Sequence, residues 1–371
     1  MSKLKKIIPD DKCNMVALIW PSMYIKKPYW EDMISIYWQI ILILLKNKNH
    51  VLIVMDISTK EIAKCMVDLK KELEEYCKKN KYSTEQKRNI ISLSNKYFHI
   101  ISYKCNDIWV RDFGPQQVKL KSNDSFLFYQ YNFNGYGEKF SYRKDKDFSK
   151  FFIKEFKENY SNRNLLTTEK PFQNLIIEGG NIQFNNKGSI IFNKRCVQKN
   201  NNEKWNNIKP VFDDAIHNKQ IQRYFYIDLE PLNGDDTNGH IDNLVRFYKN
   251  KILLYMSSND TDHPDFYLLK ELKDQLKVLN KKTSFIDNFV AINHSSENSF
   301  KKKDGSFLPF SYLNFIITNN ILIYPILRSH NEITEKRIKK IFCDKNIYFI
   351  DVEALLKESG GLHCCTLNLM Y

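Results

Sequence analysis

Paired apolar runs separated by short polar turns recur along the chain, and such pairs predict β-hairpins. Four pairs stand out: Gln116–Leu120 with Phe126–Phe133, Ile182–Phe184 with Ser189–Phe192, Leu244–Tyr248 with Ile252–Met256, and Leu313–Thr318 with Ile321–Tyr324. Their turns contain Asn123-Asp124, Asn186-Lys187-Gly188, Lys249-Asn250 and Asn319-Asn320. The recurrence indicates an internal structural repeat.

A helix and a further strand are expected after each hairpin. The helices are predicted near 146–158, 203–216, 264–280 and 331–341, and the strands near 174–177, 223–229, 284–291 and 347–351. A fifth unit is completed if the strand after Cys364 pairs with Met15–Trp20, followed by a helix near 30–46 and the strand Val51–Met55. One extra helix near 59–80 interrupts the pattern, with Ser58 and Glu61 as its capping box. We therefore expect residues 1–371 to form a single α/β domain, in which five repeats surround a central axis.

The polar motifs fall at one position in this repeat, where the last strand of a unit leads into the next hairpin. Asp112, Glu178, His240, Asn314 and Cys364 each occupy that position, one to a repeat. Five repeats around an axis would bring these five segments together at the centre. The sequence therefore predicts a central active site.

Cys364 follows Gly360-Gly361 and is the candidate nucleophile, because a thiolate is strongly nucleophilic once its pKa is lowered or a base removes its proton. The alternative is a small buried hydrophobic residue, as many cysteines are. Cys365 is expected to point to the opposite face of the strand and to be structural. His240 and Asp242 share one face by their i, i+2 spacing, which suits a proton shuttle beside a cation-binding carboxylate. A surface histidine beside a solvated aspartate is the alternative.

Two further acidic residues lie in unusual surroundings. Glu178 follows the apolar run Leu175-Ile176-Ile177, so its carboxylate must be paired, and pairing with His240 would raise the pKa of the imidazole. A structural glutamate at the Gly-Gly turn is the alternative. Asp112 lies in Trp109-Val110-Arg111-Asp112-Phe113-Gly114-Pro115, where a carboxylate could accept two hydrogen bonds from a guanidinium and Trp109 could cover the face of the cation. The alternative is a structural ion pair between Arg111 and Asp112.

Composition narrows the function classes. The formal net charge of +14 could suggest nucleic-acid binding. Lysine, however, occurs together with abundant asparagine and isoleucine, which indicates a compositional drift of the whole sequence rather than a basic binding patch. The eight cysteines form no CxxC pair, so a zinc site or thioredoxin chemistry is not expected, and their scatter fits a reducing cytoplasm. The apolar stretch Met33 to Leu45 is too short to span a bilayer. We expect a cytoplasmic protein with no metal, no cofactor, no nucleic-acid or membrane partner, and a possible homo-oligomer.

The motifs resemble those of the agmatine deiminase family, which includes the bacterial-type peptidyl-arginine deiminases. The matching segments are Trp109–Pro115, Phe133–Phe140, Glu178–Asn181, Asp235–Asn243, Ser311–Phe315 and Gly360–Thr366, in the order the family has them. The resemblance implies a pentein-like fold, a five-bladed α/β propeller with fivefold pseudosymmetry around a central active site.

The resemblance also implies roles for individual residues. Cys364 matches the nucleophile, His240 the general acid and base, and Glu178 the carboxylate that orients this histidine. Asp112 and Asp242 match the pair that binds the guanidinium group, and Trp109 matches an aromatic residue of the substrate channel. Asn314, in the fifth matching segment, is grouped with the substrate-binding residues, and Asp236 is our candidate for the amine end of the substrate.

The expected reaction is hydrolysis of a small cationic guanidino substrate, most simply agmatine to N-carbamoylputrescine and ammonia, through a covalent thiouronium on the cysteine. A peptidyl-arginine deiminase and an amidinotransferase on the same fold are the nearest alternatives. A basic nucleic-acid-binding protein is a distant one, and clustering of lysines on one face would favour it.

Overall fold

The strands of the computed structural model form five sheets of three or four strands and one two-stranded hairpin. The structure describes residues 5–120, 125–159, 165–185, 187–249, 252–284, 286–302, 304–327 and 332–371. In strand order the sheets are β19 (Thr366–Leu369), β2 (Met15–Ile19), β3 (His50–Met55) and β4 (Phe98–Ser102); β1 (Lys5–Ile7), β5 (Gln116–Leu120), β6 (Phe126–Tyr129) and β7 (Leu165–Glu169); β8 (Gln183–Phe184), β9 (Ser189–Asn193) and β10 (Arg223–Ile227); β11 (Val245–Tyr248), β12 (Ile252–Ser257) and β13 (Asn288–Asn293); and β16 (Ile316–Ile317), β17 (Ile321–Ile326) and β18 (Asn346–Asp351). The hairpin joins β14 (Phe300–Lys301) to β15 (Phe307–Leu308).

One unit recurs in all five sheets. An antiparallel pair of strands is followed in the chain by a strand that runs parallel to the second member of the pair. The four predicted hairpins are confirmed, and so is the pairing of the strand after Cys364 with β2, which joins the two ends of the chain. The turn residues Asn123, Asp124, Asn186 and Asn250 lie outside the described residues.

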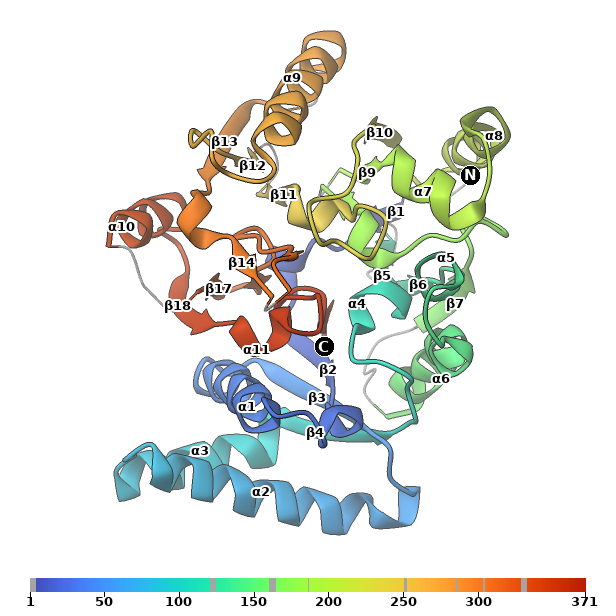
Figure 1. The fold of residues 1–371 in the computed structure, drawn as a ribbon. Coiled ribbons are helices and arrows are strands. Elements are labelled where there is room, and N and C mark those ends of the chain that lie inside the picture. Colours follow the sequence, from blue (N-terminus) through green and yellow to red (C-terminus); the bar gives the residue numbers. More distant parts are fainter. Residues whose placement is uncertain are drawn as a thin grey trace.

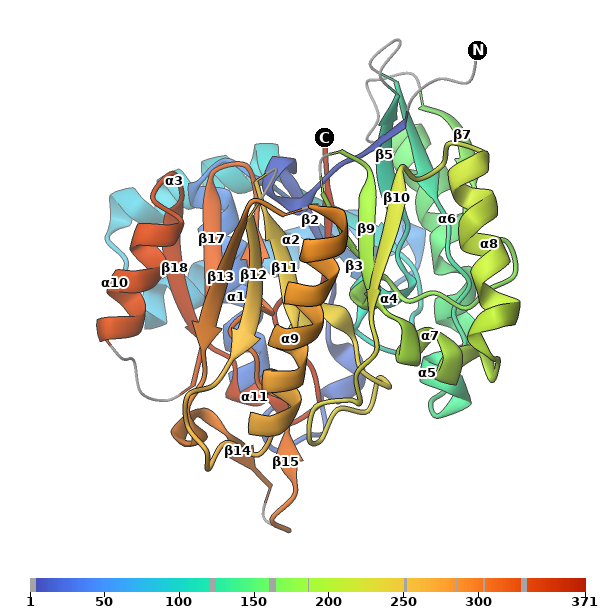
Figure 2. The same ribbon diagram turned by 90° about the horizontal axis from the view of Figure 1, so that it is seen from above.

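The helices are α1 (Trp30–Lys46), α2 (Ile62–Lys79), α3 (Thr84–Tyr97), α4 (Val110–Phe113), α5 (Gly135–Glu138), α6 (Arg143–Asn159), α7 (Lys194–Asn201), α8 (Trp205–His217), α9 (Phe266–Thr283), α10 (Glu332–Ile341) and α11 (Glu353–Leu356). Figure 1 shows the sheets gathered around a common centre, with α6, α8, α9 and α10 towards the outside. The short helices α5, α7 and α11 lie towards one end of the strands (Figure 2). The result is a mixed α/β fold.

Burial explains why the central strands carry continuous apolar runs. All residues of β2 are buried, and β3 and the inner face of α1 are buried beside them. A parallel strand covered on both faces has no solvent side, so its sequence does not alternate between apolar and polar residues. No helix among the described residues is long and apolar enough to cross a membrane.

Three sequence predictions are corrected. The strand predicted near 174–177 is wrong, because β7 pairs with β6 and residues 174–177 contribute only one isolated bridge, between Asn132 and Ile176. The segment near 59–80 is followed by a second helix, α3, and by β4, both of which were missed. The capping box is also misplaced: the Ser58 side chain donates to the Glu61 carboxylate, whereas Ser83 and Gln86 form a reciprocal box at the start of α3.

Candidate active site

A cavity of about 330 Å³ lies where several of the segments between the sheets meet. This volume lies in the range of small-ligand pockets. Of the residues predicted for the site, four line the cavity: Trp109, Asp112, Asp236 and Cys364. The other four, Glu178, His240, Asp242 and Asn314, are buried and contact these lining residues directly or through one another.

Cys364 lies just before β19, and its thiol contacts two predicted site residues. Sγ lies 3.2 Å from Nδ2 of Asn314 and 3.9 Å from Oδ2 of Asp242. Burial raises the pKa of the thiol well above its usual range, and the carboxylates of Asp242 and Asp112 raise it further. Without a ligand, Cys364 is therefore a thiol. Cys365 is fully buried, and its Sγ instead contacts the carbonyl oxygen of Leu362.

His240 lies between two carboxylates. Nε2 is 2.7 Å from Oε2 of Glu178, and Nδ1 is 3.5 Å from Oδ1 of Asp112. Burial alone would lower the pKa of His240, but these carboxylates reverse the effect and raise it. The imidazole is therefore protonated near neutral pH, which is the form that can donate a proton to a leaving group.

Asp112 is held by groups from two other segments. Its Oδ1 accepts a hydrogen bond from the backbone N–H of Gly180 at 2.9 Å, and its Oδ2 accepts one from Tyr136 Oη at 2.9 Å. A Cβ atom at position 180 would lie 2.5 Å from this Oδ1 and 2.6 Å from Nδ1 of His240, so only glycine fits there. Burial raises the pKa of Asp112, and the attraction of His240 opposes the rise.

Asp242 belongs to a buried ionic network that sequence reasoning missed. Its Oδ2 lies 2.6 Å from Nδ1 of His363, whose Nε2 lies 3.0 Å from Oδ2 of Asp10. Arg246 and Arg111 approach Asp10 at 3.1 Å and 3.6 Å. Burial would raise the pKa of Asp242, but the hydrogen bond from His363 lowers it, so the carboxylate stays ionised. The position of His363 next to Cys364 could have identified it as a site residue. No feature of the sequence around Asp10 indicates that it belongs to the same network.

Close contacts with Asn314 and Trp109 explain why glycine occupies positions 360 and 361. Oδ1 of Asn314 accepts a hydrogen bond from the backbone N–H of His363 at 2.8 Å, so it fixes the segment that carries Cys364. A Cβ at Gly361 would lie 2.5 Å from that oxygen, and a Cβ at Gly360 would lie 2.3 Å from the Trp109 ring. The Gly-Gly turn is therefore needed for close approach on both sides.

Asp236 lies on the cavity wall and forms no ion pair among the described residues. Burial raises its pKa to about 6, with a further contribution from Asp235, although a hydrogen bond with Ser359 and the charge of Lys139 lower it. Lys139 donates to the backbone carbonyl of Asp236 rather than to its carboxylate. Lys302 and Lys357 also line the cavity, so its wall carries charges of both signs.

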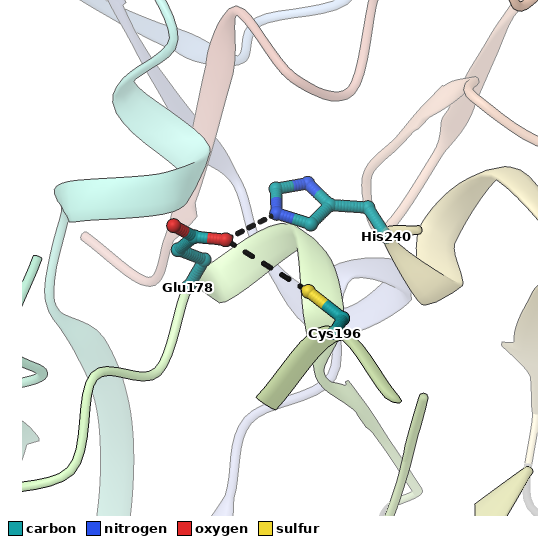
Figure 3. Close-up of side chains that lie close together, drawn as sticks. All are labelled: Glu178, Cys196 and His240. Atoms are coloured by element: carbon teal, nitrogen blue, oxygen red, sulfur yellow. Dashed lines mark hydrogen bonds and ion pairs between the residues drawn. The ribbon is translucent and has the colours of Figure 1, made fainter. Parts of the chain in front are cut away.

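One further thiol lies beside the catalytic candidates. Cys196, from α7, has Sγ 4.0 Å from Oε2 of Glu178 (Figure 3). The donor atoms of Glu178, Cys196 and His240 all lie within 4.8 Å of one another. Sequence reasoning set Cys196 aside because it belongs to no CxxC pair, and α7 itself was not predicted.

The fold places the chain in a known structural class. It matches the structure of a C. jejuni agmatine deiminase with substrate bound at 22% identity and a TM-score of 0.75, covering 100% of this chain and 98% of the other. It matches agmatine deiminase of Enterococcus faecalis at 16% identity and a TM-score of 0.73, covering 98% and 95%. A protein of Shewanella baltica named "Putative agmatine deiminase" is 24% identical over 288 residues, which are 72% of this chain and 74% of that protein.

The sequence profile of the Porphyromonas-type peptidyl-arginine deiminase family matches residues 10–369. The chain belongs to this family, and the resemblance seen in its motifs is confirmed. It is therefore a hydrolase that acts on carbon–nitrogen bonds of a guanidino group.

Proposed function

We propose that the protein hydrolyses agmatine to N-carbamoylputrescine and ammonia, through a covalent intermediate on Cys364. The observation that carries the proposal is the placement of the Cys364 thiol 3.9 Å from the Asp242 carboxylate, on a cavity that Asp112 also lines. A planar guanidinium held by two carboxylates beside a thiol presents its central carbon to the sulfur. Oδ1 of Asp242 is a buried acceptor without a partner among the described residues, and is available to the substrate.

Substrate binding also activates the nucleophile in this proposal. The two carboxylates that raise the pKa of Cys364 are those that bind the guanidinium. A bound cation cancels the charge of these carboxylates, so it lowers the pKa of the thiol and favours the thiolate when the substrate is bound. The thiolate then attacks the central carbon and forms a carbon–sulfur bond.

His240 handles the protons of both half-reactions. Protonated, it donates a proton to the departing nitrogen, which leaves as ammonia when the carbon–nitrogen bond breaks and the thiouronium forms. Neutral His240 then takes a proton from water, whose oxygen attacks the same carbon. The carbon–sulfur bond breaks, and the ureido product and the thiolate are released. Glu178 holds the imidazole through its 2.7 Å contact.

The amine end of agmatine is assigned to Asp236. This carboxylate lines the cavity and forms no ion pair among the described residues, so an ammonium would be its first ion-pair partner, beside the hydrogen bond with Ser359. Lys302 and Lys357 favour a second candidate, a peptidyl-arginine substrate with a carboxylate, because they put positive charge on the same wall. Lys357 is already paired with Glu353 at 3.1 Å, which weakens this alternative.

We also propose that the five repeated units act as blades of a propeller around this cavity. The identical strand order of the units and the pairing of β19 with β2 support the arrangement.

The test is release of ammonia from agmatine, free arginine and a peptide with a C-terminal arginine, with Cys364→Ser as the control. Agmatine is expected to react fastest. Faster reaction of the peptide would overturn the substrate, and no reaction with any guanidine would overturn the function. An amine acceptor added to the assay would reveal an amidinotransferase as an amidine-transfer product.

A further inference from the structure

We propose that Glu178, Cys196 and His240 form a binding site for a thiophilic divalent cation of the zinc class, and that its occupation switches the enzyme off. The cation would be an inhibitor and not a resident cofactor. The inhibition rests on the role proposed for His240, whereas the binding itself does not. Figure 3 shows the three side chains converging from different segments of the chain.

The geometry fits a small cation with few adjustments. Oε2 of Glu178 lies 2.7 Å from Nε2 of His240 and 4.0 Å from Sγ of Cys196. Zinc bonds of roughly 2.0–2.3 Å in a tetrahedral site hold neighbouring ligand atoms about 3.3–3.6 Å apart. All three atoms lie within 4.8 Å of one another, so shifts of about 1 Å would convert the hydrogen-bonded cluster into three corners of a zinc site.

The occupied site would carry no net charge. All three residues are 1% exposed, where an unpaired charge is costly. A carboxylate and a thiolate balance the charge of a divalent cation, and the imidazole binds in its neutral form.

Neighbouring groups match the support that metal ligands usually have. With the cation on Nε2 of His240, Nδ1 faces Oδ1 of Asp112 at 3.5 Å. Nδ1 has no hydrogen-bond partner among the described residues, and a small closure of this gap would give the carboxylate–histidine pair that is typical of zinc sites. Nδ2 of Asn200 donates to Oε2 of Glu178 at 2.6 Å and would keep the carboxylate in place. The carbonyl oxygen of Thr237 accepts a hydrogen bond from the Cys196 thiol at 3.5 Å, and this bond would be lost when the thiolate binds the cation.

Thr237 lines the cavity, so the cluster lies directly behind the cavity wall. A thiolate and an imidazole select zinc or cadmium over magnesium and calcium, which prefer oxygen ligands. Occupation would block catalysis because the metal holds the nitrogen through which His240 pairs with Glu178. The ring can then no longer alternate between its protonated and neutral forms.

Cobalt(II) is the probe for binding, since a thiolate ligand gives it a charge-transfer absorption and a tetrahedral site gives it visible bands. The titration uses the full-length Cys364→Ala protein, which lacks the nucleophile thiol. We expect the thiolate band there, its displacement by zinc but not by magnesium, and its loss in Cys364→Ala/Cys196→Ala. Cys343→Ala on the same background is the matched control, because Cys343 is an exposed thiol. A band that survives loss of Cys196, or that never forms with Cys364→Ala, would overturn the site.

The second arm measures zinc inhibition of the wild type and of Cys196→Ala, each relative to its own rate without metal. We expect the zinc concentration for half-inhibition to rise at least about tenfold in Cys196→Ala, because one of three ligands is lost. Equal inhibition of both proteins, with the cobalt band present, would overturn the regulatory claim while leaving the binding site. Lack of turnover with every guanidine would instead count against the proposed function, since the cobalt arm needs no activity.

Discussion

Nδ1 of His363 lies 2.6 Å from Oδ2 of Asp242, so the residue next to the candidate nucleophile also holds the carboxylate beside it. Oδ1 of Asp242 has no hydrogen-bond partner among the residues that the structure describes. Asp10 holds His363 from the other side, and Arg111 and Arg246 in turn pair with Asp10. We infer that His363 is a positioning residue, acting through Asp242 rather than on the substrate.

Replacing His363 tests this relationship. His363→Phe removes the donor to an ionised carboxylate, worth about 1.5–3 kcal/mol, and should lower kcat/KM for agmatine roughly 10- to 150-fold. His363→Asn keeps a donor near Nδ1 and should recover part of the loss. Thermal unfolding of both variants separates this effect from misfolding. A correctly folded His363→Phe protein with unchanged kcat/KM would remove His363 from the site.

The two adjacent cysteines give a matched pair for the nucleophile. Cys364→Ser should abolish turnover, because a hydroxyl is a far weaker nucleophile in this site. Cys365→Ser should remain active, since its side chain faces Leu362 and not the cavity. Mass spectrometry of trapped enzyme should find the adduct on the peptide that carries Cys364 alone. Activity of the Cys364→Ser protein would refute covalent catalysis by this residue.

The repeated hairpins and the motifs could be predicted because each depends only on residues that are neighbours in the sequence. Each hairpin has its own apolar runs and turn, and each motif is continuous in sequence. The strand β7 was not predictable in this way, because the runs at 165–169 and 175–177 compete for the same edge of β6 and only the pairing decides. Strand propensity alone could not decide which of the two runs forms the strand.

Contacts across the chain account for what was missed at the site. Asp10 and His363 are 353 residues apart, and neither position reveals the other. Cys196 lies on a helix that the hairpin pattern did not predict, and only the fold brings it to Glu178. The pairing of His240 with Glu178 was expected, but the second carboxylate, Asp112 at 3.5 Å, was a result of packing, and the two carboxylates raise the pKa of the imidazole against the effect of burial.

Binding and proton transfer should separate in the kinetics. Asp112→Asn or Asp242→Asn removes a charged partner of the guanidinium and should cost about 2–5 kcal/mol in kcat/KM. His240→Ala should instead stop turnover while substrate still binds, because the imidazole moves protons and does not grip the cation. The measurement is steady-state kinetics, with equilibrium binding of agmatine to the inactive protein. An His240→Ala enzyme with normal kcat but weak binding would reverse these roles.

Tyr136 should influence the pH at which kcat/KM falls on the acidic side. Asp112 must be ionised to bind a guanidinium, and its pKa is raised by burial. The hydrogen bond from Tyr136 stabilises the ionised form and so opposes this rise. Tyr136→Phe removes the bond, and the pKa of Asp112 should rise further. The acidic limb of kcat/KM should therefore move to higher pH, while the alkaline limb, assigned to loss of the His240 proton, should stay. An acidic limb that moves to lower pH would contradict this.

Asp236 should favour the amine end of agmatine over the amino-acid end of arginine as a substrate. Its carboxylate lines the cavity and forms no ion pair among the described residues, so it attracts the ammonium of agmatine and repels the carboxylate of arginine. Asp236→Asn should lower kcat/KM for agmatine, roughly tenfold for the loss of one partly buried charge pair. Arginine should lose less or gain, because a repulsive contact goes with the attractive one. Lys357→Gln is the control on the same wall, and should act in the opposite sense on any substrate with a carboxylate. The measurement is kcat/KM for agmatine, arginine and a C-terminal arginine peptide with all three proteins. If Asp236→Asn lowers all three substrates equally, Asp236 supports the cavity wall and does not read the substrate.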